Sequence, residues 1–590
     1  MKTLKLISLA LLGAGFVLPA AAADMNKVLR VAIEAPETGF DPAKVSDVYS
    51  LYVVENIFDP LIRYDYLARP VKLVPNTIVA MPTISPDFKV FTFKIKPGIY
   101  FSDDSVFKGK KRELTAEDYV YSLKRFADPQ INSPTGTGFT DFILGLEEAG
   151  KAKGKFDYNA PVAGLKALDR YTLQITLKKP GPNFLYTLAS KQAGAVAREA
   201  IEAYAKNTNA HPVGTGPFVL KEWKQGNKIV LEANPGFRKV VFDSVAGKDA
   251  VDAGIVKALK GKTLPIVGRV EVSVIEETQP RWLSFLNKQL DVLMMPSDAV
   301  PDSLTLNPKD PYKVGLKPAL AAKGIQLQHI LRWEKTYDFF NMADPVVGGY
   351  GKDKIALRRA IAMAYPREEV IATLFRGQGV PLGNLIPLGM DGNNPKLNFG
   401  VKYDPAAANA LLDKFGYKIG ADGYRALPNG KPLVVEQLTQ SSGRDKMFNE
   451  VWQKTFDSIK VRIKFKTAKW NENLKAARGG NFQMWGLGGS ASTPDGDDFV
   501  TGLWSKGIGE FNYAQFRNDE YDKAYIASQA LPHSPERTRL YDQLNKIAAA
   551  YQPYILGMTA FRNFVNQSYV KGYKPHPVEG TTWRYLDIQK

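Results

Sequence analysis

The chain has 590 residues and no cysteine, and it carries a formal net charge of +18 at neutral pH. The lack of cysteine excludes disulfides, thiolate metal sites and a lipidated N-terminal cysteine, and the length predicts more than one domain. Basic residues are dispersed apart from one run at 108–112, so a solvated surface explains the charge and no nucleic-acid partner is expected.

The N-terminal segment has the pattern of a secretory signal peptide. Two lysines precede an apolar run at 6–18, and residues 20–23 offer an Ala-x-Ala cleavage site. The apolar run is too short to be a transmembrane anchor. We therefore expect residues 1–23 to be removed on export, leaving a periplasmic protein without a lipid anchor that begins near Asp24.

The segment 85–126 predicts a strand, a turn, a second strand and a capped helix. Apolar and polar residues alternate over 91–96, and a Pro-Gly turn leads to a short strand at 99–101. Thr115 stands three residues before Asp118, which is the spacing of a capping box at a helix N-terminus.

Other periodic stretches predict the remaining framework. Strands are expected at 28–33, 173–177, 218–221, 229–231 and 270–274, and helices at 279–290, 354–365, 366–377 and 537–544. Asp404 should cap a further helix, with Pro405 at its first position.

Motifs of common enzymes are incomplete. Residues 261–263 are Gly-Lys-Thr, but Val256 stands where a phosphate loop needs glycine. There is no Gly-x-Ser-x-Gly elbow, the four histidines lack metal-ligand spacing, and the acidic run at 495–498 lacks the spacing of a calcium loop. We expect no enzyme activity, no catalytic residue, no metal and no cofactor.

Several phrases of the sequence, in a consistent order between about residues 28 and 573, resemble one protein family. They include the segment 85–126 with its TAEDYV, HPVGTGPFVL from 211, KIALRRAIAMAYPREEV from 354, YDPAAANALLDKFGY from 403, and NDEYDKA from 518. The family is that of the large solute-binding proteins that serve dipeptide and oligopeptide ABC importers. Residues 239–262 exceed the family's usual length and are expected to be an insertion.

The resemblance implies a two-lobed α/β periplasmic-binding-protein fold of the large-cluster type, with an extra subdomain in lobe I and a ligand cleft between the lobes. The domain boundaries expected are lobe I at 24–328, lobe II at 329–559, and a return to lobe I at 560–590. Such a protein closes on its ligand by hinge motion.

The implied function is that of a monomeric periplasmic protein that binds peptides or peptide-like solutes and delivers them to an inner-membrane ABC permease. One alternative is a non-peptide solute on the same fold, such as a sugar, an opine-like compound, a metal chelate or haem. A second alternative is a sensor. A secreted hydrolase would need a nucleophile or carboxylate pair that the sequence does not reveal.

The resemblance also places several candidate ligand contacts. Ser46 and Val48 follow the first strand and would face the cleft from lobe I, unless they form an ordinary turn and helix start. Phe339 lies in the strand that resembles the family's crossing into lobe II. Arg444 stands where related proteins sometimes place a carboxylate-binding arginine, with a solvated helix-start residue as the alternative.

Residues 482–499 depart most from the family pattern. Dipeptide and oligopeptide binders have a tryptophan here, followed about three residues on by an aspartate that binds the peptide's ammonium group. Trp485 is present, but Gly488 stands three residues on, and the nearest acid is Asp495.

Two hypotheses follow for ligand binding by this segment. In the first, Asp495 folds back and binds an ammonium group. In the second, the ligand has no ammonium, and Gly488, Ser490 and Ser492 bind an uncharged or anionic group, with Arg444 as the counter-charge.

Overall fold

A mixed sheet organises the N-terminal part of the chain, of which the computed structural model describes residues 23–307 and 310–590. Its order is β1-β12-β9-β8, formed by β1 (Asp24–Ile33), β12 (Val267–Val274), β9 (Lys228–Ala233) and β8 (Phe218–Lys224). Strands β1 and β12 are parallel and the other pairs antiparallel. The strands expected here are confirmed, whereas the proposed signal peptide lies almost wholly outside the described residues.

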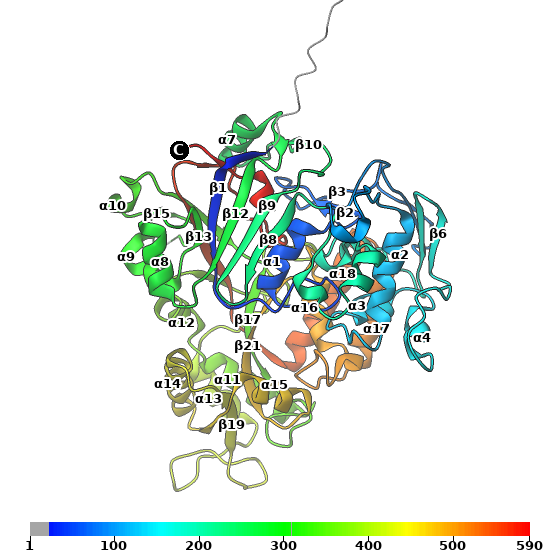
Figure 1. Cartoon of the computed structure of the whole chain (residues 1–590). Coiled ribbons are helices and arrows are strands. Elements are labelled where there is room, and N and C mark those ends of the chain that lie inside the picture. Colours follow the sequence, from blue (N-terminus) through cyan, green and yellow to red (C-terminus); the bar gives the residue numbers. More distant parts are fainter. Residues whose placement is uncertain (1–22, 308–309) are drawn as a thin grey trace, which may run out of the picture.

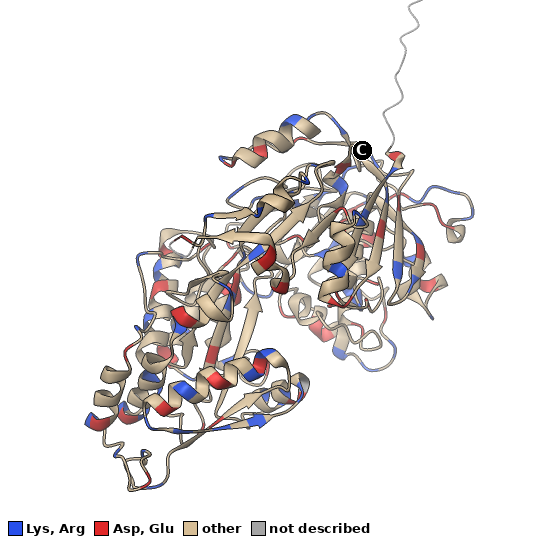
Figure 2. Cartoon of the chain, turned by 90° about the vertical axis from the view of Figure 1, so that its left-hand side faces the viewer, with Lys and Arg blue, Asp and Glu red and all other residues tan. Residues whose placement is uncertain are grey.

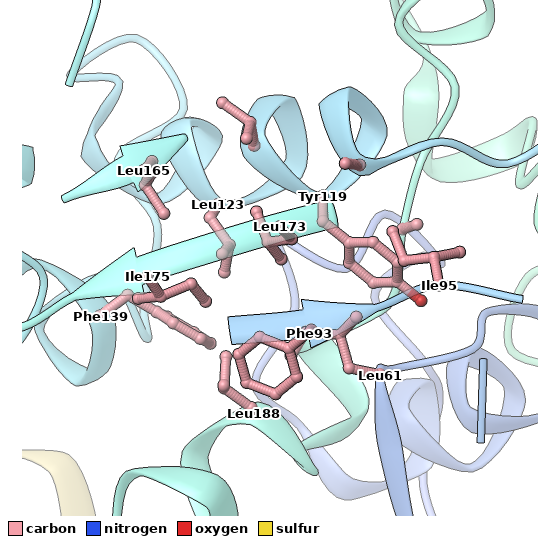
Figure 3. Close-up of a cluster of buried hydrophobic side chains, with 14 of the residues drawn as sticks. Leu61, Phe93, Ile95, Tyr119, Leu123, Phe139, Leu165, Leu173, Ile175 and Leu188 are labelled. Carbon is pink, nitrogen blue, oxygen red and sulfur yellow. The ribbon is translucent and has the colours of Figure 1, made fainter. Parts of the chain in front are cut away.

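A second, antiparallel sheet lies beside the first and has its own core. Its order is β4-β5-β7-β6, from β4 (Thr83–Ile84), β5 (Val90–Lys94), β7 (Thr172–Thr176) and β6 (Leu165–Asp169). Helix α2 (Ala116–Lys124) covers it, and the alternating residues Phe93 and Ile175 point into the cluster shown in Figure 3. The capping box is confirmed, since the Asp118 carboxylate accepts the Thr115 backbone N–H at 2.7 Å.

The prediction of a strand at 99–101 is wrong. Only Tyr100 forms a β-bridge, with Glu113, because the chain turns into a 3-10 helix at Ser105–Phe107 before a ladder can develop.

A five-stranded sheet organises the second half of the chain, with the order β20-β19-β21-β17-β22. Its strands are β20 (Arg462–Thr467), β19 (Val434–Thr439), β21 (Met484–Ser490), β17 (Glu334–Phe340) and β22 (Tyr554–Leu556). Helices cover both faces. Asp404 caps α13 as expected and accepts the Ala407 N–H at 2.8 Å.

Strand alternation assigns the two faces of this sheet to different cores. Phe340 and Met484 pack with α11 (Lys352–Ala364), α13 (Pro405–Lys414) and α14 (Gly443–Ser458). Phe339 and Trp485 pack on the other face with α17 (Asp519–Gln529) and α18 (Pro535–Tyr551).

A small sheet connects the two halves. The long strand β23 (Met558–Asn566) pairs with β13 (Val292–Met294) and β16 (Gln326–Leu331), and its first residues pair with β18 (Gly379–Pro381). The chain passes between the halves from β16 to β17 and returns from β22 to β23. Figure 1 shows β17 and β21 near the junction of the two halves. We call the half with the β1 and β5 sheets lobe I and the half with the β17 sheet lobe II.

Charged residues of both signs are interspersed along the described chain, as Figure 2 shows, which agrees with a solvated basic surface. Within the described residues, every helix is too short or too polar to cross a lipid bilayer.

Candidate functional site

A cavity of about 680 Å³ lies between the lobes. Lobe I contributes residues 295–300, which follow β13, and β23 contributes Phe561 and Asn563. Lobe II contributes β17, β21, α14 and α12 (Arg367–Thr373). Pockets of this size commonly hold small ligands, so the cavity is the candidate binding site.

Strand β21 forms a wall of the cavity that carries almost no side chains. The register places Gly486 opposite Asp338, Gly488 opposite Thr336 and Ser490 opposite Glu334. Because alternate residues share a face, this face of β21 offers two glycines and one serine. The cavity therefore reaches the backbone of the strand.

The outer edge of β21 is also open. Strand β19 pairs with β21 only through Gln437 and Met484, whereas β17 pairs with β21 along its whole length. In the described part of the chain, residues 486–490 thus have a strand partner on one side only. An unpaired edge presents backbone N–H and C=O groups to which an extended peptide can add.

Four arginines line the cavity, namely Arg367, Arg376, Arg444 and Arg562. Arg562 donates to Glu334 at 2.8 Å, whereas Arg444 lies over the rings of Phe375 and Phe448 at 5.2 and 5.7 Å. Partial burial and the nearby Arg562 charge lower the pKa of Arg444. An anionic ligand group would relieve this repulsion.

Asp338 is a carboxyl at the cavity that lacks a cationic partner among the described residues. Burial raises its pKa to about 7, against the opposing effect of a hydrogen bond with the Trp452 side chain. The Trp452 ring is stacked on Tyr365, with centroids 4.5 Å apart. Sequence reasoning missed this residue, although a single acid in the apolar run Tyr-Asp-Phe-Phe was a usable signal.

Lys335, three residues earlier on β17, extends from the opposite face of the sheet. Its ammonium lies over the rings of Tyr337, Phe499 and Tyr554 at 4.7 to 5.3 Å and donates to the Phe499 carbonyl at 3.3 Å. Burial lowers its pKa to about 7. The lysine therefore belongs to the core on the α18 side, and its charge does not face Asp338.

Four of the nine predicted site residues line the cavity, namely Arg444, Trp485, Gly488 and Ser490. The Trp485 side chain is 2% exposed, so the strand backbone is the part of this residue that a ligand can reach. The expectation for the Phe339 ring is wrong, because it is fully buried on the same far face as Trp485.

Ser46, Val48 and Ser492 do not line the cavity. Val48 begins α1 and is 45% exposed. The backbone N–H and hydroxyl of Ser492 both donate to Asp498, at 2.6 and 3.0 Å, so its polar groups are engaged within their own loop.

The hypothesis that Asp495 binds an ammonium group is contradicted by its surroundings. Its side chain is buried, and its carboxylate pairs bidentately with Arg537. The Tyr541 hydroxyl and the Asn183 amide also donate to it, at 2.8 and 2.9 Å. Both carboxylate oxygens are therefore occupied by internal partners.

Two lobes around a solvent-accessible cavity define a solute-binding protein of the periplasmic-binding type. A family model for bacterial extracellular solute-binding proteins, family 5, matches residues 72–511. The chain belongs to this family of binding proteins.

Curated relatives match over most of their length. The dipeptide-binding protein of Escherichia coli is 25% identical over 84% of this chain and 82% of its own. Heme-binding protein A of Haemophilus influenzae is 24% identical, with 80% of this chain and 76% of the relative covered.

Solved structures share the fold. DppA of Helicobacter pylori in complex with the peptide STSA aligns over 95% of this chain and 98% of its own, with a TM-score of 0.69 and 22% identity. HbpA2 of Haemophilus parasuis aligns over 95% and 100%, with a TM-score of 0.71 and 20% identity. The predicted two-lobed α/β fold is confirmed.

Proposed function

We propose that this protein is the periplasmic substrate-binding component of an ABC importer and that it binds short peptides or peptide-like solutes between its lobes. The observation that carries the proposal is the open edge of β21 at 486–490, which faces the cavity and pairs with β17 alone. Added strands gain affinity from main-chain hydrogen bonds, whatever the peptide's side chains. Relatives described as dipeptide- and di/tripeptide-binding proteins support this solute class.

The proposed mechanism is binding without covalent chemistry. Lobe I would comprise residues 24–328 and 560–590, and lobe II residues 329–559, so that β16–β17 and β22–β23 form the hinge. Closure would bury the peptide, and the closed monomer would dock on a membrane permease. A peptide carboxylate would pair with Arg444, whose guanidinium has ring contacts but no acidic partner among the described residues.

Titration of the mature protein with Ala-Ala-Ala in a calorimeter tests the proposal. We expect a dissociation constant in the micromolar range or below, a smaller radius of gyration by small-angle scattering, and full recovery of intact peptide. Arg444→Ala should weaken binding about tenfold, which corresponds to about 1.4 kcal/mol. Arg462→Ala, which removes an exposed ion pair with Asp422, is the control and should bind as the parent does.

Absence of binding across a panel of dipeptides to pentapeptides would refute the peptide proposal. Cleavage of the peptide would refute binding without chemistry, and an unchanged radius of gyration would refute hinge closure.

We also propose that export removes the first 23 residues. Protein recovered from a periplasmic extract should have an N-terminus near Asp24, because the two lysines, the apolar run and the Ala-x-Ala site precede it. N-terminal sequencing checks this, and a chain that begins at Met1 in that fraction would contradict it.

A further inference from the structure

Asp338 is a partly buried acid at the cavity that has no cationic partner in the described chain. Glu334 is paired with Arg562, and the Asp445 carboxylate is bonded to Ser442 at the start of α14. Asp298, from lobe I, is near the Thr278 hydroxyl at 3.4 Å. Asp338 is partly removed from water, lies directly opposite a glycine in the sheet, and is without a cation in the described chain.

Gly486 leaves the approach to this carboxyl open. The two residues are directly opposite in the β17–β21 ladder. A Cβ atom on residue 486 would lie only 2.5 Å from the Asp338 Oδ1 atom. Any side chain at this position would therefore cover the carboxyl, whereas glycine leaves it reachable from the cavity.

The physical chemistry of an unpaired acid favours one kind of ligand group. Partial desolvation disfavours the ionised form of an isolated carboxyl group. An opposite charge within a few ångströms stabilises that ionised form. We propose, building on the peptide-binding function proposed above, that Asp338 receives a cationic group of the solute, an ammonium or guanidinium, through the gap left by Gly486.

The position of the arginine predicts the spacing of the ligand's charges. Arg444 and Trp452, which contacts Asp338, are eight residues apart on α14, or about 12 Å along the helix. An extended peptide of about three to four residues spans this distance. The cation can therefore be the N-terminal ammonium of a short peptide or a basic side chain.

A calorimetric comparison at pH 7 tests the inference with Ala-Lys-Ala, Ala-Nle-Ala and the N-acetylated form of each. Acetylation removes the N-terminal ammonium, and norleucine removes the lysine ammonium. The change that removes the cation bound by Asp338 should weaken binding of the peptide to the parent protein at least tenfold. Whether acetylation or the norleucine exchange causes the loss identifies the source of the cation. In Asp338→Asn the same change should alter affinity less than twofold. The control is Asp457→Asn, on α14 and outside the cavity lining. It should keep the parent's preference for the peptide that carries the cation.

The pH dependence provides a second readout. Affinity of the parent for the preferred peptide should rise several-fold from pH 5.5 to 7, because Asp338 becomes ionised as the pH approaches its pKa of about 7, while both amines stay mostly protonated. The groups packed against it are Trp452 from α14, Gly486 from β21 and Tyr365, whose pKa is raised well above its ordinary value by burial and then by Asp338. Asp338→Asn should lose this pH dependence.

The outcomes separate the two proposals. If peptides bind but the parent does not discriminate the cation, or if Asp338→Asn discriminates as the parent does, the inference is overturned and the peptide-binding proposal stands. If none of the four peptides binds and the panel of dipeptides to pentapeptides gives no binding either, the peptide-binding proposal fails and the inference fails with it.

Discussion

Replacing Asp495 with asparagine is expected to lower the free energy of unfolding of lobe II by about 3–5 kcal/mol, the usual cost of removing one partner from a buried ion pair. The Arg537 side chain is 3% exposed, and its guanidinium would lose its counter-charge and one of its two oxygen acceptors. The Tyr541 hydroxyl and the Asn183 amide would lose a charged acceptor as well.

Urea denaturation followed by tryptophan fluorescence measures this loss. Asp422→Asn is the matched control, because it breaks an exposed pair with Arg462 and should cost at most about 1 kcal/mol. A loss below about 1 kcal/mol for Asp495→Asn, accompanied by a collapse of peptide affinity, would instead return Asp495 to the role of ammonium ligand.

Filling the cavity from its glycine wall is expected to have the largest effect on binding. Gly488→Leu should weaken Ala-Ala-Ala binding at least 100-fold, or about 2.7 kcal/mol, because the side chain would project into the space beside β21 that the peptide needs. The folded protein should accept it, since the nearest heavy atom to a Cβ at this position is the Lys335 carbonyl oxygen, 3.8 Å away.

Calorimetry and thermal denaturation separate the two effects. Gly315→Leu is the control, because Gly315 also lies in a strand, β15 (Val314–Leu316) of lobe I, and a Cβ atom at this position would enter open space. It should leave affinity unchanged. Parent-like affinity in Gly488→Leu would show that the peptide does not occupy this cavity.

Local signals predicted the framework well. The capping residues Thr115 and Asp404 and the alternating strands depend on neighbours within a few positions, so the sequence displays them directly. Even so, strict alternation could have corrected the site prediction. Trp485 and Gly488 are an odd number of residues apart, which places their side chains on opposite faces of one strand.

The charges of the site could not be predicted because they depend on distant partners. Asp495 is neutralised by Arg537, 42 residues away, and accepts a hydrogen bond from Asn183 of the other lobe. The isolation of Asp338 depends on the order of the β strands, which places glycine opposite it. Neither fact is encoded in local spacing.

The strand β23 has a mechanical consequence. It is hydrogen-bonded to β16 in lobe I through residues 561–566 and to β18 through residues 558–560, so the lobes share one continuous strand. If the lobes move as rigid bodies, this shared strand opposes sliding and favours bending and twisting about itself. We therefore expect the mouth of the cavity to open widest at the side farthest from β23, which would give an incoming solute one direction of entry.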